Sequence, residues 1–398
     1  MRQQMAFLLT GLLLGTVGHG EETTKSPLIV IENAEDWHAG VFCGHPNVRS
    51  FVPGRTFHTA LWGMMTFDRA GNAYVAAETF IAIVTPNGRV EVLTGQPGIA
   101  GNTDGLPGVA TFGNAIDLAM AGDDLIYVVD AANFTLRRID RHAGVWLTET
   151  VAGVPGKQGH RDGPGYQALF EPVFDSVAAD RKGAAYLFAG DRIRKFENGV
   201  VTTLNSKGKR GYVNGPLDRA CFHHGHGRRG GLALDGRGNL YVADKMNLVI
   251  RKVDLERGVV TTLAGRLPNE PRTKPRDGNA AAARFHAAGG PTTLAYDPTR
   301  NWLFVHSDDE RWVRIIRPGS AGMEVRTLGI REELRGKLFP KLRALENYPG
   351  FARNAAIPGK TRLIDGLPAA VDAKGNLYLV NYKSLQNQIL VVRKEGVK

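Results

Sequence analysis

The chain has 398 residues, 43% of them hydrophobic, which is enough for a substantial core and normal for a large all-β array. Its 49 glycines and 8% aromatic residues favour many short strands joined by tight turns, and no stretch after residue 20 is apolar and long enough for a transmembrane helix. The formal net charge of +11 at pH 7 permits anionic partners, although a solvated basic surface without a specific partner is the simpler interpretation.

Residues 1–20 have the pattern of a secretory signal peptide. A short basic start precedes the apolar run AFLLTGLLLG, and small residues stand at Gly18 and Gly20. A membrane anchor is the alternative, but the run is too short to span a bilayer comfortably. We therefore expect a secreted or periplasmic protein, with no transmembrane segment after cleavage. An oxidising compartment would permit a disulfide between Cys43 and Cys221, but only geometry decides whether they pair.

Residues 27–32 (PLIVIE) are the first predicted strand, and a repeated unit follows. Each copy has an apolar triplet, a turn rich in Gly, Asp and Asn, and then an aromatic residue with an apolar pair. Copies spaced roughly 50 to 75 residues apart are typical of propeller blades with variable loops. We expect blades near residues 60–95, 112–153, 170–205, 222–265, 285–329 and 363–393.

The fourth copy, GGLALDGRGNLYVADKMNLVIRKVDLERGVVTTLAG, shows all the strands of one blade. Its apolar runs predict strands at 231–234, 240–243, 249–253 and 259–263. Four antiparallel strands of this length make one blade, and a blade must stack on neighbours because it cannot bury both of its faces alone.

A second signature precedes four of the copies. It reads DGLPGVATF (104–112), DGPGYQALF (162–170), NGPLDRACF (214–222) and DGNAAAARF (277–285). The preference of Phe for the protein interior predicts that each closing Phe plugs the seam between consecutive blades.

The last copy has three predicted strands, 367–372, 376–380 and 389–393. We expect the strand at 27–32 to complete this blade from the other terminus and so remove an exposed edge. Residues 331–362, rich in Arg, Lys and Leu, predict a basic helical insertion between the fifth and sixth blades, broken at Pro340. It is either a longer connection or an arm that caps one face.

The quoted motifs, above all Asp-Gly…Ala-Arg-Phe, Gly-Asn-Leu-Tyr-Val-Ala-Asp, Ile-Arg-Lys-Val and Val-Val-Thr-Thr-Leu-Ala-Gly, resemble the NHL-repeat family. The match covers about residues 63–329 and resumes at 366–393, with a departure at His306-Ser307 where an Asp is usual. The resemblance implies an all-β, six-bladed propeller of four-stranded antiparallel blades around a central channel, built from residues 21–398 as one domain.

Propellers bind ligands at the channel mouth, so the residues before each apolar triplet are the candidates. For ligand binding these are His58, Trp62, Arg228, Arg229, His286 and Asp365, of which the two arginines suit an anionic group.

A divalent cation is a second hypothesis for this mouth. Its candidate ligands are Asp117, Asp175, His224 and His226, because carboxylates favour Ca²⁺ and several imidazoles favour Zn²⁺. Six-bladed relatives in the lactonase and amidating-lyase groups use channel metals. The simpler interpretation is that the two aspartates bond backbone amides and that the histidines are solvated or bonded to backbone in a glycine-rich loop.

These features lead to an exported propeller that binds a protein or anionic polymer ligand on one face, as a monomer and without enzymatic activity or a defined cofactor. The alternative is a hydrolase or lyase with a divalent cation at the channel mouth. Nucleic-acid binding is the third hypothesis, and the expected export weighs against it.

Overall fold

The computed structural model describes residues 29–33, 35–43, 64–86, 89–205, 209–225, 231–267, 275–285, 289–307, 313–327, 329–331, 361–363, 367–381 and 388–394. Within them the regular structure is β-strand, apart from three short 3-10 helices, η1 (Gly165–Gln167), η2 (Leu217–Arg219) and η3 (Lys245–Asn247). The all-β prediction is confirmed. No helix in the described part of the chain is long and apolar enough to cross a membrane.

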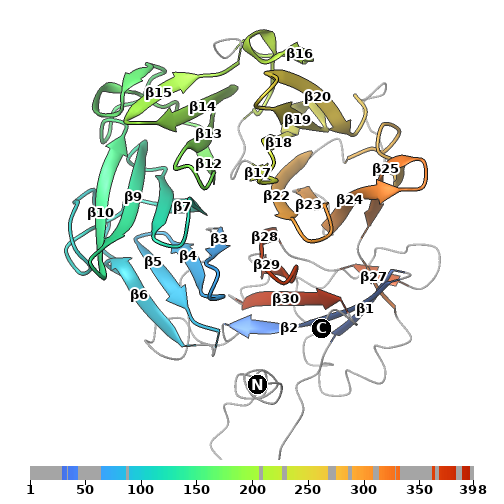
Figure 1. Cartoon of the computed structure of the whole chain (residues 1–398), viewed down its shortest axis with the longest axis horizontal. Helices are drawn as coiled ribbons and strands as arrows, with labels where there is room; N and C mark the ends of the chain where they lie inside the picture. The colour runs from blue at the N-terminus through green and yellow to red at the C-terminus, as the bar shows by residue number, and fades with distance from the viewer. Residues whose placement is uncertain are drawn as a thin grey trace, which may run out of the picture.

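Six sheets of four or five strands surround a common centre (Figure 1). The first contains β3 (Met65–Phe67), β4 (Ala73–Ala77), β5 (Phe80–Val84) and β6 (Val90–Gly95). The second contains β7 (Ala115–Met120), β8 (Leu125–Asp130), β9 (Thr135–His142) and β10 (Val145–Ala152). The third contains β12 (Phe174–Ala179), β13 (Ala185–Ala189), β14 (Arg192–Glu197) and β15 (Val200–Thr203), with the short β11 (Gly163–Pro164) outside.

The fourth sheet contains β17 (Leu232–Leu234), β18 (Asn239–Asp244), β19 (Val249–Asp254) and β20 (Val259–Ala264), with β16 (Gly215–Pro216) outside. The fifth contains β22 (Pro291–Asp297), β23 (Trp302–Ser307), β24 (Val313–Gly319) and β25 (Gly322–Thr327), with β21 (Gly278–Asn279) outside. All the pairings are antiparallel, and the four strands predicted for the fourth copy are confirmed. The innermost strands β3, β7, β12, β17, β22 and β28 contact one another in a closed ring.

The hydrophobic core lies in the seams between neighbouring sheets. One cluster joins the first sheet to the second, and further clusters join the second to the third, the third to the fourth and the fourth to the fifth. The closing phenylalanines of the linkers lie in these seams and are at most 1% exposed: Phe112, Phe170, Phe222 and Phe285. The predicted role of these side chains is therefore confirmed.

Each of these four phenylalanines packs under a buried arginine of the third strand, which the sequence analysis did not single out. The guanidinium carbons of Arg137, Arg194, Arg251 and Arg314 lie 4.9, 5.2, 4.9 and 5.4 Å from the respective ring centroids. Each arginine also donates to the carbonyl of the residue just before its phenylalanine. The arginine thus ties the third strand of a sheet to the linker that enters that sheet.

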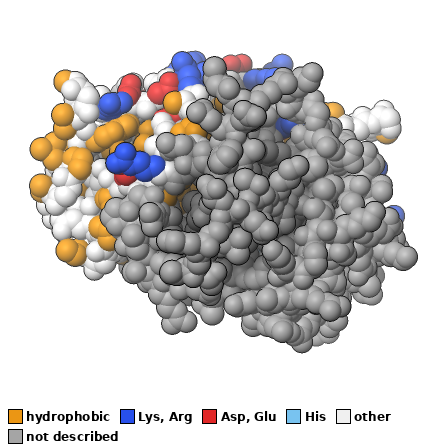
Figure 2. All heavy atoms as spheres, turned by 90° about the horizontal axis from the view of Figure 1, so that it is seen from below, with side chains coloured by type: hydrophobic (Ala, Val, Ile, Leu, Met, Phe, Trp, Pro, Cys, Tyr) orange, Lys and Arg blue, Asp and Glu red, His pale blue; other side chains and the backbone are white. Residues whose placement is uncertain are grey.

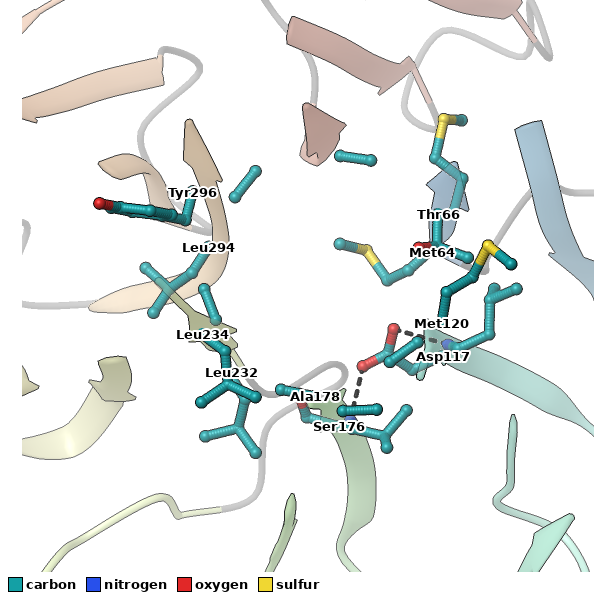
Figure 3. Close-up of a pocket in the computed structure, with 18 of the residues that line it drawn as sticks. Met64, Thr66, Asp117, Met120, Ser176, Ala178, Leu232, Leu234, Leu294 and Tyr296 are labelled. Atoms are coloured by element: carbon teal, nitrogen blue, oxygen red, sulfur yellow. Dashed lines mark hydrogen bonds between the residues drawn. The ribbon is translucent and has the colours of Figure 1, made fainter. Parts of the chain in front are cut away.

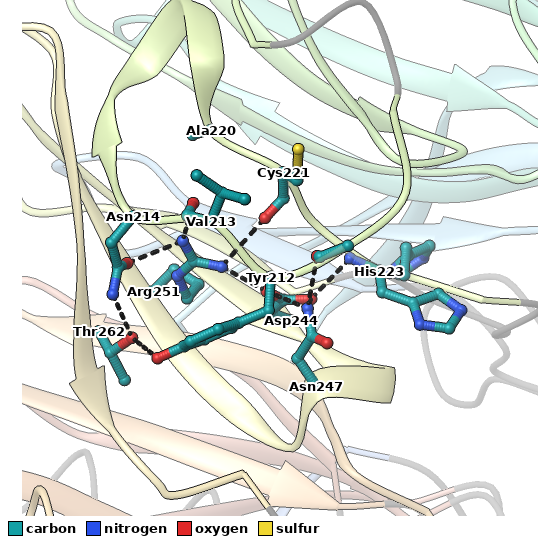
Figure 4. A network of polar contacts seen from close by, with 12 residues as sticks. Tyr212, Val213, Asn214, Ala220, Cys221, His223, Asp244, Asn247, Arg251 and Thr262 are labelled. Atoms are coloured by element: carbon teal, nitrogen blue, oxygen red, sulfur yellow. Dashed lines mark hydrogen bonds and ion pairs between the residues drawn. The ribbon is translucent and has the colours of Figure 1, made fainter.

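Arg251 shows how such a charge is accommodated (Figure 4). Its Nη1 donates to the Asp244 carboxylate at 2.8 Å. Its Nη2 donates to the Val213 carbonyl at 2.7 Å and to Asn214 Oδ1 at 2.8 Å. Both Arg251 and Asp244 are fully buried, and the ion pair and these hydrogen bonds offset part of the loss of hydration, although burial still raises the pKa of Asp244.

The last sheet, ordered β1-β2-β30-β29-β28, corrects one prediction about closure. Its strands are β28 (Leu367–Val371), β29 (Leu377–Asn381), β30 (Gln388–Lys394), β2 (Glu35–Cys43) and β1 (Ile29–Asn33). The N-terminal part of the chain does close this sheet, but β2 pairs with β30, whereas the predicted segment 27–32 contributes to the outer strand β1. Strands pair through backbone hydrogen bonds, which any sequence can make. The apolar character of residues 27–32 therefore did not determine which strand pairs with β30.

The predicted helical insertion at 331–362 is described only at its ends. There, β26 (Gly329–Arg331) pairs with β27 (Thr361–Leu363) as a two-stranded antiparallel sheet. The rest of this segment and the expected signal peptide lie outside the described residues.

Candidate functional site

Three of the predicted site residues fall within the described part of the chain. Asp117 lies on β7, Asp175 on β12, and His224 follows the linker that enters the fourth sheet. The other predicted residues lie outside it: His58, Trp62, His226, Arg228, Arg229, His286 and Asp365. Cys221 is buried, while the side chain of Cys43 is not among those described, so the disulfide that an oxidising compartment would permit is not tested.

His224 and Asp175 meet across the seam between the third and fourth sheets. Nε2 of His224 lies 3.2 Å from Oδ1 and 3.1 Å from Oδ2 of Asp175. Both side chains are buried, and the imidazole packs on Phe188 with ring centroids 4.5 Å apart. The structure thus brings together two of the predicted residues, and His224 is buried instead of solvated.

Two further carboxylates hold the backbone of this segment. The His224 N–H donates to Asp191 Oδ1 at 2.8 Å, and the His223 N–H donates to Asp244 Oδ1 at 2.8 Å. Asp191 follows β13 in the third sheet, and Asp244 ends β18 in the fourth. Sequence reasoning missed both anchors, although Asp244 belongs to the quoted Tyr-Val-Ala-Asp motif.

A basic group stands beside these anchors. Nε of Arg210 lies 3.0 Å from Oδ2 of Asp191, the same carboxylate that holds the His224 amide. The Arg210 side chain is 61% exposed, so a cationic group faces solvent next to the first residues of the segment 222–229, which reads FHHGHGRR.

The electrostatics of His224 depend on its aspartate. Burial by itself would lower the pKa of His224, but the Asp175 carboxylate and its hydrogen bond outweigh burial, so the pKa of His224 is raised above its ordinary value. Lys245 opposes this rise and Asp191 supports it. The pair therefore favours a protonated imidazolium against a buried carboxylate.

Asp117 has a different environment, on the inner strand of the second sheet. Its Oδ1 accepts the Leu118 N–H and its Oδ2 accepts the Val177 N–H, both at 2.9 Å, so the expectation that it bonds backbone amides is confirmed. Burial raises the pKa of Asp117 to about 7, against the lowering effect of these two bonds and of the Ser176 hydroxyl.

Asp117 also lines a cavity of about 200 Å³ at the centre of the ring (Figure 3). The wall takes residues from all six innermost strands, β3, β7, β12, β17, β22 and β28. Most of the lining residues are apolar, but Met65, Leu232 and Leu294 belong to the cores between the sheets, and the surface that lines the cavity is mostly polar.

The metal hypothesis has three of its four residues within the described part of the chain. There, no group of three or more His, Cys, Asp or Glu side chains is arranged to hold a metal ion. His226 lies outside that part, so the cation site stays a prediction.

One face of the molecule is shown in Figure 2. On its described part, Lys and Arg side chains lie beside Asp and Glu side chains. The net charge of +11 is therefore not gathered there into a patch of one sign.

The fold and the repeated arginine–phenylalanine seams define the chain as a β-propeller with four-stranded antiparallel blades. No family model matches the chain. Its repeats are similar to those of NHL repeat-containing protein 2 of Bos taurus, with 27% identity over 286 residues. That match covers 64% of this chain and 38% of the bovine protein. The resemblance to NHL-repeat propellers is confirmed, and the chain spans only about 38% of the length of this curated relative.

Solved structures share the fold at low identity. An auxiliary nutrient binding protein from Bacteroides thetaiotaomicron superposes with a TM-score of 0.57 and 10% identity, over 94% of this chain and 79% of that one. A protein of unknown function from the same organism gives a TM-score of 0.56 and 12% identity, over 94% of this chain and 78% of that one. Similarity at this level shows the fold alone.

Proposed function

We propose that the chain is a six-bladed, exported NHL-type propeller that serves as a binding scaffold for an anionic polymer or an acidic protein surface. The ligand is held where the linker enters the fourth blade, and no bond of the ligand is made or broken. A nutrient-binding role for one propeller of similar fold is compatible with such a scaffold. Among the described residues, no observation favours the hydrolase or lyase alternative.

The observation that carries the proposal is the way the base of the FHHGHGRR segment is fixed. Carboxylates from two blades hold two consecutive amides, and a third carboxylate holds the His224 ring. The next residues along the chain include Arg228 and Arg229. Holding this base in one conformation before a ligand arrives lowers the entropic cost of binding there.

Arg210 extends this basic surface within the described residues. Its exposed guanidinium keeps donors in addition to Nε, and guanidinium forks match sulfate and carboxylate groups of acidic polymers. Arg210, together with Arg228 and Arg229 further along the sequence, is the set that we propose to bind successive anionic groups along a polymer.

The test is the binding of a sulfated heparin-derived oligosaccharide, measured by calorimetry at physiological salt. We expect Arg210→Ala to weaken binding about threefold, the effect of losing one exposed ion pair, and the triple change with Arg228→Ala and Arg229→Ala to weaken it more than about tenfold.

The matched control is Arg257→Ala. Arg257 is also an exposed arginine beside an aspartate, with its Nη1 3.7 Å from Asp254 in the fourth sheet. Equal losses for Arg210→Ala and Arg257→Ala would show that binding follows net charge alone and would contradict a site at the linker.

A further inference from the structure

The linker that enters the third sheet displays a large aromatic side chain that the fold does not use. Tyr166 lies on η1, and its side chain is 74% exposed. At the same distance from the first residue of their signatures, the other three linkers carry Gly108, Asp218 and Ala281. The linker therefore packs without a ring at this position, and the ring of Tyr166 is available to a ligand.

Backbone contacts fix the place where this ring is presented. The Gly165 N–H donates to the Gly199 carbonyl at 2.8 Å, and the Gly165 carbonyl accepts the Gly153 N–H at 3.0 Å. A Cβ atom at Gly165 would lie 2.0 Å from the carbonyl oxygen of Val151, so only glycine lets the chain pass this close to β10. Tyr166 is thus held between the second and third sheets, and its ring offers contact area at a small entropic cost.

A guanidinium group lies beside the same turn. Nε of Arg161 donates at 2.6 Å to the carbonyl of Gln167, the residue that follows Tyr166. Arg161 is exposed, and its Nη groups meet no carboxylate among the described residues. Its own carbonyl accepts the Leu169 N–H and Nη2 of Arg194, both at 3.0 Å, so its backbone is fixed as well. The turn therefore presents an aromatic ring and a fork of donors together.

This turn lies within reach of the basic group at the next linker. Arg210 pairs with Asp191, just before β14, and the Arg161 carbonyl accepts a hydrogen bond from Arg194 within β14. These two anchoring residues are three positions apart in the chain, at most about 11 Å even when fully extended. A short further segment of a polymer bound at Arg210 is therefore enough to reach Arg161.

We propose that the anionic polymer is an acidic polysaccharide, with one sugar ring on Tyr166 and a sulfate or carboxylate of the same segment on Arg161; this inference rests on the proposed function. The C–H groups on one face of a pyranose ring suit the negative face of an aromatic ring, and the guanidinium fork matches the anionic substituent. An acidic peptide supplies carboxylates, but its Asp and Glu side chains have no ring to lay on Tyr166.

A nucleic acid also combines rings with negative charge. Proteins that hold single strands stack successive bases on successive aromatic side chains. The equivalent positions of the other three linkers carry no ring, so the described linkers provide one aromatic contact and not a series. This favours a sugar polymer, and the test below includes an oligonucleotide.

The test measures binding by calorimetry at physiological salt with three probes of similar charge: the sulfated heparin-derived oligosaccharide, poly-L-glutamate and oligothymidylate. We expect Tyr166→Ala to weaken binding of the oligosaccharide about tenfold and to change binding of poly-L-glutamate by less than about twofold, because only the ring contact is lost. Tyr166→Phe keeps the ring and should stay within about twofold of the unaltered chain. The matched control is Leu106→Ala, 49% exposed on the linker that enters the second sheet, which should change neither affinity.

Three results would overturn the proposal. They are equal losses of oligosaccharide and poly-L-glutamate binding in Tyr166→Ala, no loss for either, and tighter binding of oligothymidylate than of the oligosaccharide that depends on Tyr166. Weaker oligosaccharide binding in Arg210→Ala with no effect of Tyr166→Ala would contradict this inference alone. The reverse pattern would contradict the site at the fourth linker and leave the sugar contact at Tyr166. Both side chains are exposed, so neither substitution should impair folding.

Discussion

Four arginines and four phenylalanines recur at equivalent positions of the second to fifth sheets. The buried arginine joins the third strand to the incoming linker, and the first residue of each linker signature supplies a partner: Asp104, Asp162, Asn214 and Asp277. The linker motif that ends in Phe and the third-strand motif that contains Arg therefore supply the two sides of one contact. The phenylalanine could be predicted from its burial preference, but the arginine could not, because a charged residue in a strand is more often on the surface.

Removing one of these arginines should strongly destabilise the folded state. We expect Arg251→Met to lower the free energy of unfolding by about 3–5 kcal/mol, because Asp244 is then left as an uncompensated buried charge. Urea denaturation followed by tryptophan fluorescence measures the change.

Two controls make this result specific to the buried pair. Arg257→Met at an exposed position should change the free energy of unfolding by less than about 1 kcal/mol, and adding Asp244→Asn to Arg251→Met should restore part of the loss. A loss for Arg251→Met as small as that for Arg257→Met would refute the seam role.

The His224–Asp175 pair predicts a pH dependence of stability. The pKa of His224 is raised in the folded state, so its contribution is fully present below about pH 6.5, the ordinary histidine value, and is lost as pH rises through the folded pKa. The stability difference between the native chain and His224→Gln should therefore shrink from pH 6 towards about pH 9.

Denaturation midpoints of both chains across this range measure that difference. His142→Gln, at a histidine whose side chain is 72% exposed, serves as the comparison. A difference for His224→Gln that stays constant or grows with pH would be incompatible with an imidazolium held by Asp175.

The site residues differ in how well the sequence predicts them. Asp117 and Asp175 stand at the starts of inner strands, where the repeat alignment places channel residues, and both are buried near the centre. The alignment could not show that Asp175 contacts His224 of the next sheet. The two residues are 49 positions apart in the chain, and their contact depends on how neighbouring sheets stack. Asp191 was missed because it follows a strand whose Ala-Gly-Asp ending departs from the repeat.

At the scale of elements, hairpin repeats were the predictable part of the fold. The strands of the fourth copy and the three strands of the last copy lie within one or two residues of their predicted bounds. The strand that closes the last sheet was harder to predict. The hairpin β1–β2 offers two candidate strands, and the hydrogen bonds between β2 and β30 are made by backbone groups common to any sequence.

An engineered disulfide tests that closure. Gly40 and Val391 are directly opposite on β2 and β30, so Gly40→Cys with Val391→Cys should form a disulfide under mild oxidation. Peptide mapping by mass spectrometry detects it. His38→Cys with Val391→Cys is two residues out of register, since His38 faces Arg393, and should form little or none. Equal yields from both pairs would mean that β2 does not have this register.

At the scale of the whole molecule, the ring of innermost strands separates two kinds of site. The linker entering the fourth sheet carries fixed amides and the exposed Arg210, whereas the cavity at the centre has one carboxyl group, that of Asp117, in its wall.

Amide hydrogen exchange with and without the sulfated oligosaccharide tests the binding role most directly, because it maps contact without any substitution. The account predicts slower exchange on binding in peptides covering 209–232, and no change in peptides from β10 or from β25. Protection confined to those outer strands, or no protection at 209–232 under saturating ligand, would contradict a binding site at the linker of the fourth blade.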